Sequence, residues 1–178
     1  RRHRLAVELQ PLEGGVTAAA GFRAAGVACG LKRSGLDLAI VAADRPVSAA
    51  GLFTTNRAQA APVLVSKRHL AASGGRAVAV VINSGCANAC TGPEGEAAAE
   101  AMAEETARRL GAPPELVLVA STGVIGVALD RAAVARGIAA AVPALARERH
   151  AEAARAIMTT DRVPKEAAVC VPLGPSAR

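Results

Sequence analysis

Two short apolar runs, each ending in a polar segment that contains glycine, most constrain how this chain can fold. Residues 76–82 lead into Asn83-Ser84-Gly85, and residues 116–120 lead into Ser121-Thr122-Gly123. Each run has the length of a buried strand, and the residues after it are typical of a turn. Glycine lets the main chain approach a ligand, and a threonine hydroxyl can stabilise an oxyanion. The second segment is therefore either a plain strand-end turn or part of a catalytic site.

Helical patterns follow both runs. A capping-box pattern, Thr91-Gly92-Pro93-Glu94, opens a helix with apolar residues at helical spacing, and Gly111 supplies its stop signal. Asp130 is suited to cap a second helix, which Pro143 ends, and a third helix runs to about Met158. The region after residue 75 thus alternates strands with helices.

The N-terminal third is predicted to be rich in β-structure. Alternating or continuous apolar residues predict strands, with a last strand near the C-terminus; the expected ranges are 36–41, 47–54, 63–65 and 167–171. The predicted fold class is α/β (α+β), with a layered mixed sheet flanked by helices. Residues 1–15 form a charged N-terminal segment, and residues 16–178 form a single α/β domain.

Composition limits the core and the partners. Apolar residues make up 52% of the chain, yet it has two phenylalanines and no tyrosine or tryptophan, so a closely packed core of small and β-branched side chains is expected. The net charge of +6 raises the question of nucleic acid, but the cations are scattered and few aromatics are available to stack on bases. No apolar run is long enough to cross a membrane. We expect no nucleic-acid or membrane partner and a cytoplasmic location.

The chain offers no convincing nucleophile or general base. His3, His69 and His150 lie in charged surroundings and are expected at the surface. The four cysteines lack the spacing of a zinc site or disulfide framework and are interpreted as buried or half-buried thiols. The stretch Gly26-x-x-x-Gly30-x-Lys32 does not fit a phosphate-binding loop. Such a chain is either not an enzyme or one half of an enzyme.

Five ordered segments resemble the signature blocks of the ornithine acetyltransferase family, the glutamate N-acetyltransferases of arginine biosynthesis. The resemblance extends from about Val16 to Val171. It rests on Gly15-Val16-Thr17-Ala18-Ala19-Ala20-Gly21-Phe22, Ala49-Ala50-Gly51-Leu52-Phe53-Thr54-Thr55-Asn56, Asn83-Ser84-Gly85-Cys86-Ala87-Asn88-Ala89-Cys90-Thr91-Gly92, Ser121-Thr122-Gly123-Val124-Ile125-Gly126 and Ala156-Ile157-Met158-Thr159-Thr160-Asp161.

The resemblance implies an Ntn-like fold and a precursor that cuts itself into an α and a β chain. The chain would be the α chain, and the N-terminal threonine of the β chain would be the nucleophile. The resemblance places Thr122 and Gly123 in the oxyanion hole and Thr159 and Thr160 at the substrate site, without deciding which of these two threonines makes the contact. It implies no metal and no cofactor.

The implied reaction is a ping-pong transfer of acetyl from N2-acetylornithine to L-glutamate through an acetyl-threonine. Whether acetyl-CoA is also a donor stays open, because both kinds of family member share these blocks. The implied assembly is an α2β2 heterotetramer.

The sequence departs from the family pattern in two places. The family's α chain continues into a Lys-Gly-x-Gly-Met segment and the cleavage site, which this sequence lacks, and Cys86 stands where many relatives have asparagine. Two alternatives stay open: a self-cleaving aminopeptidase or amidase of similar fold, which uses the same nucleophile and oxyanion chemistry, and a non-catalytic subunit that binds small molecules, which the missing nucleophile suggests.

Overall fold

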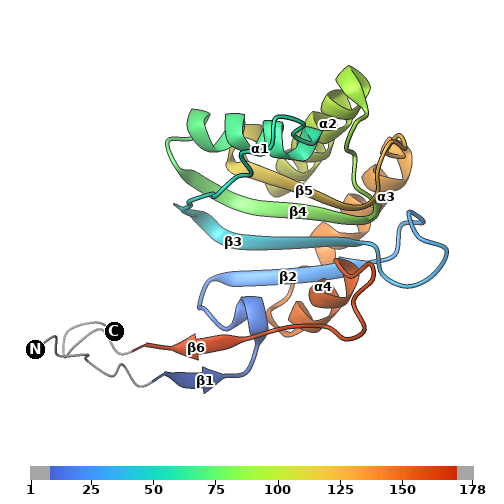
Figure 1. The fold of residues 1–178 in the computed structure, drawn as a ribbon. Coiled ribbons are helices and arrows are strands. Elements are labelled where there is room, and N and C mark those ends of the chain that lie inside the picture. The colour runs from blue at the N-terminus through green and yellow to red at the C-terminus, as the bar shows by residue number, and fades with distance from the viewer. Residues whose placement is uncertain (1–8, 172–178) are drawn as a thin grey trace, which may run out of the picture.

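The computed structural model describes residues 9–171, and its centre is a four-stranded mixed sheet (Figure 1). The strands lie in the order β2-β3-β4-β5. Strand β3 is antiparallel to both β2 and β4, whereas β4 and β5 are parallel. Their bounds are β2 (Phe22–Val27), β3 (Leu38–Ser48), β4 (Arg76–Cys86) and β5 (Val117–Val124). The predicted class, a mixed sheet flanked by helices, is confirmed.

Helices cover both faces of the sheet. Their bounds are α1 (Ala61–Ala72), α2 (Gly92–Leu110), α3 (Arg131–Ala141) and α4 (His150–Ala156). The first three share one core cluster with alternate residues of the strands, such as Ile40 and Val81. Helix α4 packs on β2 and β3 through a separate cluster that includes Ala39. Because side chains alternate along a strand, the two clusters lie on opposite faces.

Small side chains let these layers approach closely, as the composition predicts. Alanine and valine make up most of the buried apolar residues. At Gly26 of β2, a Cβ atom would come within 2.2 Å of the Glu152 carbonyl oxygen of α4. The helix backbone therefore rests directly on the strand, and even an alanine at this position would push the two layers apart.

The unit β4–α2–β5 is a parallel crossover. Gly111 ends α2 in the left-handed conformation (φ 68°), as its stop signal predicts. The capping-box prediction is wrong in its detail, because Thr91 makes no cap bond and donates instead to the Asn88 side chain at 2.8 Å. Since β4 and β5 are parallel, their C-terminal ends meet at one end of the sheet. This brings together the two polar segments that follow the apolar runs.

Two predictions for the N-terminal region are wrong. Residues 63–65 belong to α1, which begins at Ala61 and has Pro62 in its first turn. The predicted strand 47–54 shrinks to residues 47–48, which complete β3 beyond a bulge. Both errors arose because a short apolar run has no period long enough to separate a strand from a buried helical turn.

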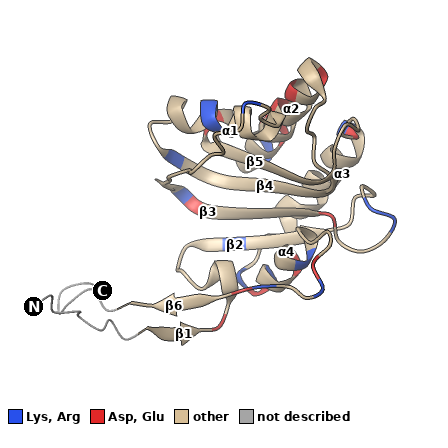
Figure 2. Cartoon of the chain, viewed as in Figure 1, with Lys and Arg blue, Asp and Glu red and all other residues tan. Residues whose placement is uncertain are grey.

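The remaining elements lie around this sheet. The last predicted strand is confirmed as β6 (Ala168–Cys170), but it pairs with β1 (Gln10–Leu12) in a separate two-stranded sheet. Short 3-10 helices span Gly15–Thr17, Pro114–Leu116, Val142–Ala144 and Arg147–Arg149. Lys and Arg, like Asp and Glu, are scattered over the elements of the chain (Figure 2). None of the helices between residues 9 and 171 combines the length and apolar character of a membrane span.

Candidate functional site

The polar ends of β4 and β5 form the core of the candidate site. In the parallel ladder Ser84 is paired with Thr122 and Gly85 with Gly123. The predicted turn at Ser121 is therefore wrong, because β5 continues through these residues to Val124. Thr122 is half-buried and Gly123 is exposed. The Thr122 hydroxyl and the Gly123 backbone thus lie at an accessible strand end, which pairing with β4 holds in place.

Two glycines are required where these strand ends touch. Gly123 has a φ of 132°, and a Cβ atom there would lie 2.4 Å from the carbonyl carbon of Gly85. Gly85 has a φ of 104°, and its Cβ would lie 2.8 Å from the Leu31 carbonyl oxygen. Glycine alone fits such contacts without strain. The loop that contains Leu31 therefore packs directly against the end of β4, on Gly85.

A buried aspartate organises that loop. The Asp37 carboxylate is fully buried and accepts four backbone N–H bonds, from Cys29 at 2.7 Å, Gly30 at 3.1 Å, Leu31 at 2.8 Å and Lys32 at 3.0 Å. Burial by itself would raise the pKa of this carboxyl, but the N–H donors outweigh it and hold the pKa below its ordinary value of 3.8. Asp37 is therefore an anion that fixes the loop between β2 and β3.

The thiol of Cys29, beside the buried Asp37, is not a ready nucleophile. Burial, together with the adjacent Asp37 carboxylate, raises the pKa of the Cys29 thiol from 9.0 to about 12, so it stays protonated at neutral pH. Cys86 is buried and Cys29 half-buried, as expected, but Cys90 and Cys170 are exposed, contrary to the prediction. Among residues 9–171 no group of three or more His, Cys, Asp or Glu side chains could hold a metal ion.

The segment after α4 is bound to the same strand ends. Ser84 Oγ donates to the Ala156 carbonyl oxygen at 2.6 Å, and Lys32 Nζ donates to the Met158 carbonyl oxygen at 3.0 Å. Thr159 and Thr160 follow at once and are exposed. Ser84 and Thr122 are paired, so their side chains share the sheet face that α4 covers. The structure thus attaches the backbone that directly precedes residues 159–160 to the end of the sheet that carries residues 122–123.

Sequence reasoning missed Lys32, Asp37 and Ser84. The stretch from Gly26 to Lys32 does not fit a phosphate-binding loop, and no local pattern in it reveals that its N–H groups converge on Asp37. Ser84 was visible only as part of a polar segment. The only sequence signal for these roles is the presence of Lys32 and Asp37 close to the glycines of the connection between β2 and β3.

The surface prediction is wrong for His69, which is buried, and His3 lies outside the described residues. The His69 ring nitrogens lie 2.8 Å from the Val117 carbonyl oxygen and 3.0 Å from a Glu100 carboxylate oxygen. These partners connect α1 to β5 and α2, far along the strands from Thr122. His69 therefore has a structural role, and His150 lies on α4 with Glu166 as its partner at 2.7 Å.

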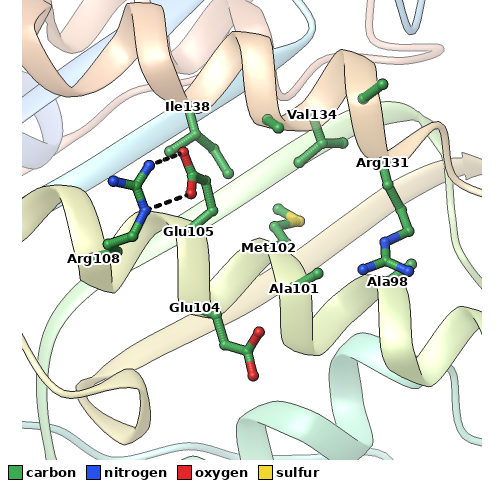
Figure 3. A pocket seen from close by; sticks show the side chains of 11 residues that line it. Ala98, Ala101, Met102, Glu104, Glu105, Arg108, Arg131, Val134 and Ile138 are labelled. Atoms are coloured by element: carbon green, nitrogen blue, oxygen red, sulfur yellow. Dashed lines mark hydrogen bonds and ion pairs between the residues drawn. The ribbon is translucent and has the colours of Figure 1, made fainter.

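The hollow between α2 and α3 does not include the predicted site residues. It has a volume of about 470 Å³ and is lined by apolar residues such as Met102 and Ile138. Glu105 and Arg108 at its rim face each other and pair (Figure 3). The charges of this pair neutralise each other, while Glu104 and Arg131 also line the hollow, which lies apart from the ends of β4 and β5.

Two other hollows lie beside the candidate site. One of about 390 Å³ lies under Val41, Val80 and Ile82 and extends to Ile157 of the segment after α4. The other, of about 310 Å³, runs along the free edge of β5 at Leu118 and Ala120. Apolar strand residues on the α4 face are therefore left open next to the strand ends.

Comparisons with known proteins match this chain to one family. The family model described as the ArgJ family matches residues 23–178. The chain is 50% identical to the arginine biosynthesis bifunctional protein ArgJ of Symbiobacterium thermophilum over 166 residues, which are 92% of the chain and 41% of that relative. It is 49% identical to the ArgJ of Gloeobacter violaceus, over 92% of the chain and 40% of that relative. The chain thus spans about two fifths of the length of these curated relatives.

Two solved structures have the same fold. The structure of ArgJ from Bacillus halodurans superimposes with a TM-score of 0.82 at 34% identity and covers 96% of each chain. The structure of the ornithine acetyltransferase of Mycobacterium tuberculosis complexed with ornithine has a TM-score of 0.83 at 41% identity, covering 95% of this chain and 96% of the other.

Proposed function

Because the chain belongs to the ArgJ family, we propose that it is the α chain of a glutamate N-acetyltransferase that moves acetyl from N2-acetylornithine to L-glutamate in arginine biosynthesis. One observation carries the proposal. The register of β4 and β5 aligns Thr122 and Gly123 at an accessible strand end, and the glycine contact there leaves no space for any other residue. That arrangement suits a site that stabilises an oxyanion.

The nucleophile is proposed to be the N-terminal threonine of a β chain cut from the same precursor. The lengths of the relatives support the division of a precursor into an α and a β chain. The chain matches about two fifths of two curated relatives but 96% of the Bacillus halodurans and Mycobacterium tuberculosis chains in solved structures. Members of one family thus occur both as a long sequence and as a chain of the present extent.

The proposed reaction proceeds in two acyl transfers. The threonine hydroxyl, deprotonated by its own α-amine, attacks the acetyl carbonyl of N2-acetylornithine, and ornithine leaves with a proton. Glutamate then attacks the acetyl-threonine ester and restores the hydroxyl. In both steps the Thr122 hydroxyl and the Gly123 N–H would donate to the negative oxygen. This chemistry requires neither a metal nor a cofactor, and acetyl-CoA stays a candidate second donor.

The β chain is proposed to cover the open part of the sheet face next to Thr122. Val80, Ile82 and Leu118 line hollows there and are only half-buried. Beyond β5, Val124 and Ile125 are 59% and 65% exposed. Apolar surface of this extent next to a polar site is typical of an interface. Assembly into an α2β2 heterotetramer in the cytoplasm completes the proposal.

Acetyl transfer by the full-length protein tests this proposal. After expression of the complete gene, intact-mass analysis should detect a companion chain that begins with threonine. Ornithine should be released from N2-acetylornithine in a glutamate-dependent manner, with N-acetylglutamate as the second product. Release of acetate instead would indicate an amidase or aminopeptidase. The absence of a companion chain, together with binding but no turnover, would favour a non-catalytic subunit.

Replacing Thr159 and Thr160 singly by alanine should identify the substrate contact. Both are exposed beside the strand ends, so neither change should alter the melting temperature. The residue that binds substrate should show a KM for N2-acetylornithine raised about tenfold, equivalent to one lost hydrogen bond of roughly 1.4 kcal/mol. Steady-state kinetics on both variants checks this. Unchanged kinetics in both would remove this segment from the substrate site.

A further inference from the structure

Lys32 connects two parts of the candidate site that lie far apart in the sequence. Its ammonium donates to the Met158 carbonyl oxygen at 3.0 Å. Its Cγ would lie 3.0 Å from a Cβ atom on Gly85, so the side chain runs past that glycine. Gly85 in turn contacts Gly123, the predicted oxyanion donor. One side chain therefore extends from the strand ends to the residue directly before Thr159.

The backbone of Lys32 is fixed independently of its side chain. Its N–H donates to Asp37, which also accepts from three preceding residues. A lysine on a free surface would lose considerable rotamer entropy on making one bond. Here the loop is already ordered, so the ammonium starts close to its acceptor.

The segment that Lys32 holds is attached at few points. Ser84 binds the Ala156 carbonyl oxygen at the end of α4, and Lys32 binds the Met158 carbonyl oxygen two residues later. Thr159 and Thr160 then extend, exposed, into solvent. Without the lysine, the bond from Ser84 to Ala156 would be the last of these two attachments, three residues before Thr159, and the chain could swing away from Thr122.

We propose that Lys32 is a positioning residue of the acetyl-transfer site: by holding the Met158 carbonyl, it sets Thr159 and Thr160 at the distance from Thr122 and Gly123 that the substrate requires. This inference rests on the proposed function. It assigns Lys32 no contact with the reacting atoms. It concerns only the position of Thr159 and Thr160.

The test compares Lys32→Met, Lys32→Arg and Arg33→Met in the full-length enzyme. Arg33 is the exposed neighbouring cation, so its variant removes the same charge without touching Met158. Loss of a hydrogen bond from a charged donor should raise the KM for N2-acetylornithine about tenfold in Lys32→Met and change kcat less than about threefold. Lys32→Arg should restore most of the affinity, because its guanidinium can donate to the same carbonyl. Arg33→Met should match wild type.

Hydrogen exchange supplies a readout that does not depend on catalysis. Amides of residues 157–162 should exchange faster in Lys32→Met than in wild type, whereas residues 29–32, held by Asp37, should not change. If wild type fails to transfer acetyl, the proposed function falls but the exchange comparison still tests the attachment. Unchanged exchange, or faster exchange with an unchanged KM, would overturn the inference. Should Lys32→Met fold poorly, Lys32→Gln, whose amide is too short to reach, serves in its place.

Discussion

Replacing Thr122 by alanine is expected to lower kcat by on the order of 10²–10³, the usual cost of removing one oxyanion-hole donor. The hydroxyl stands at the end of β5 on the same sheet face as Ser84 and the segment after α4. A donor in a fixed strand requires no reorganisation when the negative oxygen forms. Single-turnover and steady-state kinetics on the processed full-length enzyme measure the loss.

The control is Thr122→Ser, which retains the hydroxyl and should keep most of the activity. Thr122 is half-buried and its backbone stays in the β4–β5 ladder, so both variants should melt close to the wild-type temperature. Near-normal turnover by Thr122→Ala would remove this residue from the oxyanion hole. A large fall in melting temperature would instead assign it a structural role.

Replacing Asp37 by asparagine should destabilise the chain by on the order of 3 kcal/mol, because hydrogen bonds to a charged acceptor are lost and an amide N–H₂ is turned toward buried N–H donors. The carboxylate is fully buried and holds the Cys29–Lys32 backbone against Gly85. Urea unfolding at neutral pH measures the difference. Asp44→Asn is the matched control: its partner Arg23 is exposed, so the loss there should stay below about 1 kcal/mol.

The pH dependence gives this prediction a second signature. The folded-state pKa of Asp37 lies below the ordinary value of 3.8, so the unfolded chain binds the extra proton first as pH falls. Its contribution to stability is therefore present above about pH 4 and is lost as pH falls through the folded-state pKa. The gap between wild type and Asp37→Asn should be full at pH 7 and shrink below pH 4. A gap that does not change with pH would show that the charge is not what holds the loop.

The sequence predicts correctly those elements that depend on regularly spaced apolar residues and on helix-capping or helix-ending residues. The helix ended by Gly111, the helix capped by Asp130 and the strands predicted at 36–41, 76–82 and 116–120 are confirmed, whereas β2 was not predicted. Asp130 accepts from the Ala133 N–H at 2.9 Å, as a cap should. These features follow from interactions within a few residues. The same reasoning failed at residues 63–65, because a three-residue run cannot reveal its period.

The sequence by itself determined that Thr122 and Gly123 follow a buried strand, and the resemblance then gave them a role. Only the tertiary structure decided that β4 and β5 are parallel neighbours, that Gly85 and Gly123 touch, and that Lys32 reaches Met158. The last bond spans 126 residues, and the four donors of Asp37 are backbone groups common to nearly every residue. Such contacts depend on how the layers pack, so no local pattern encodes them.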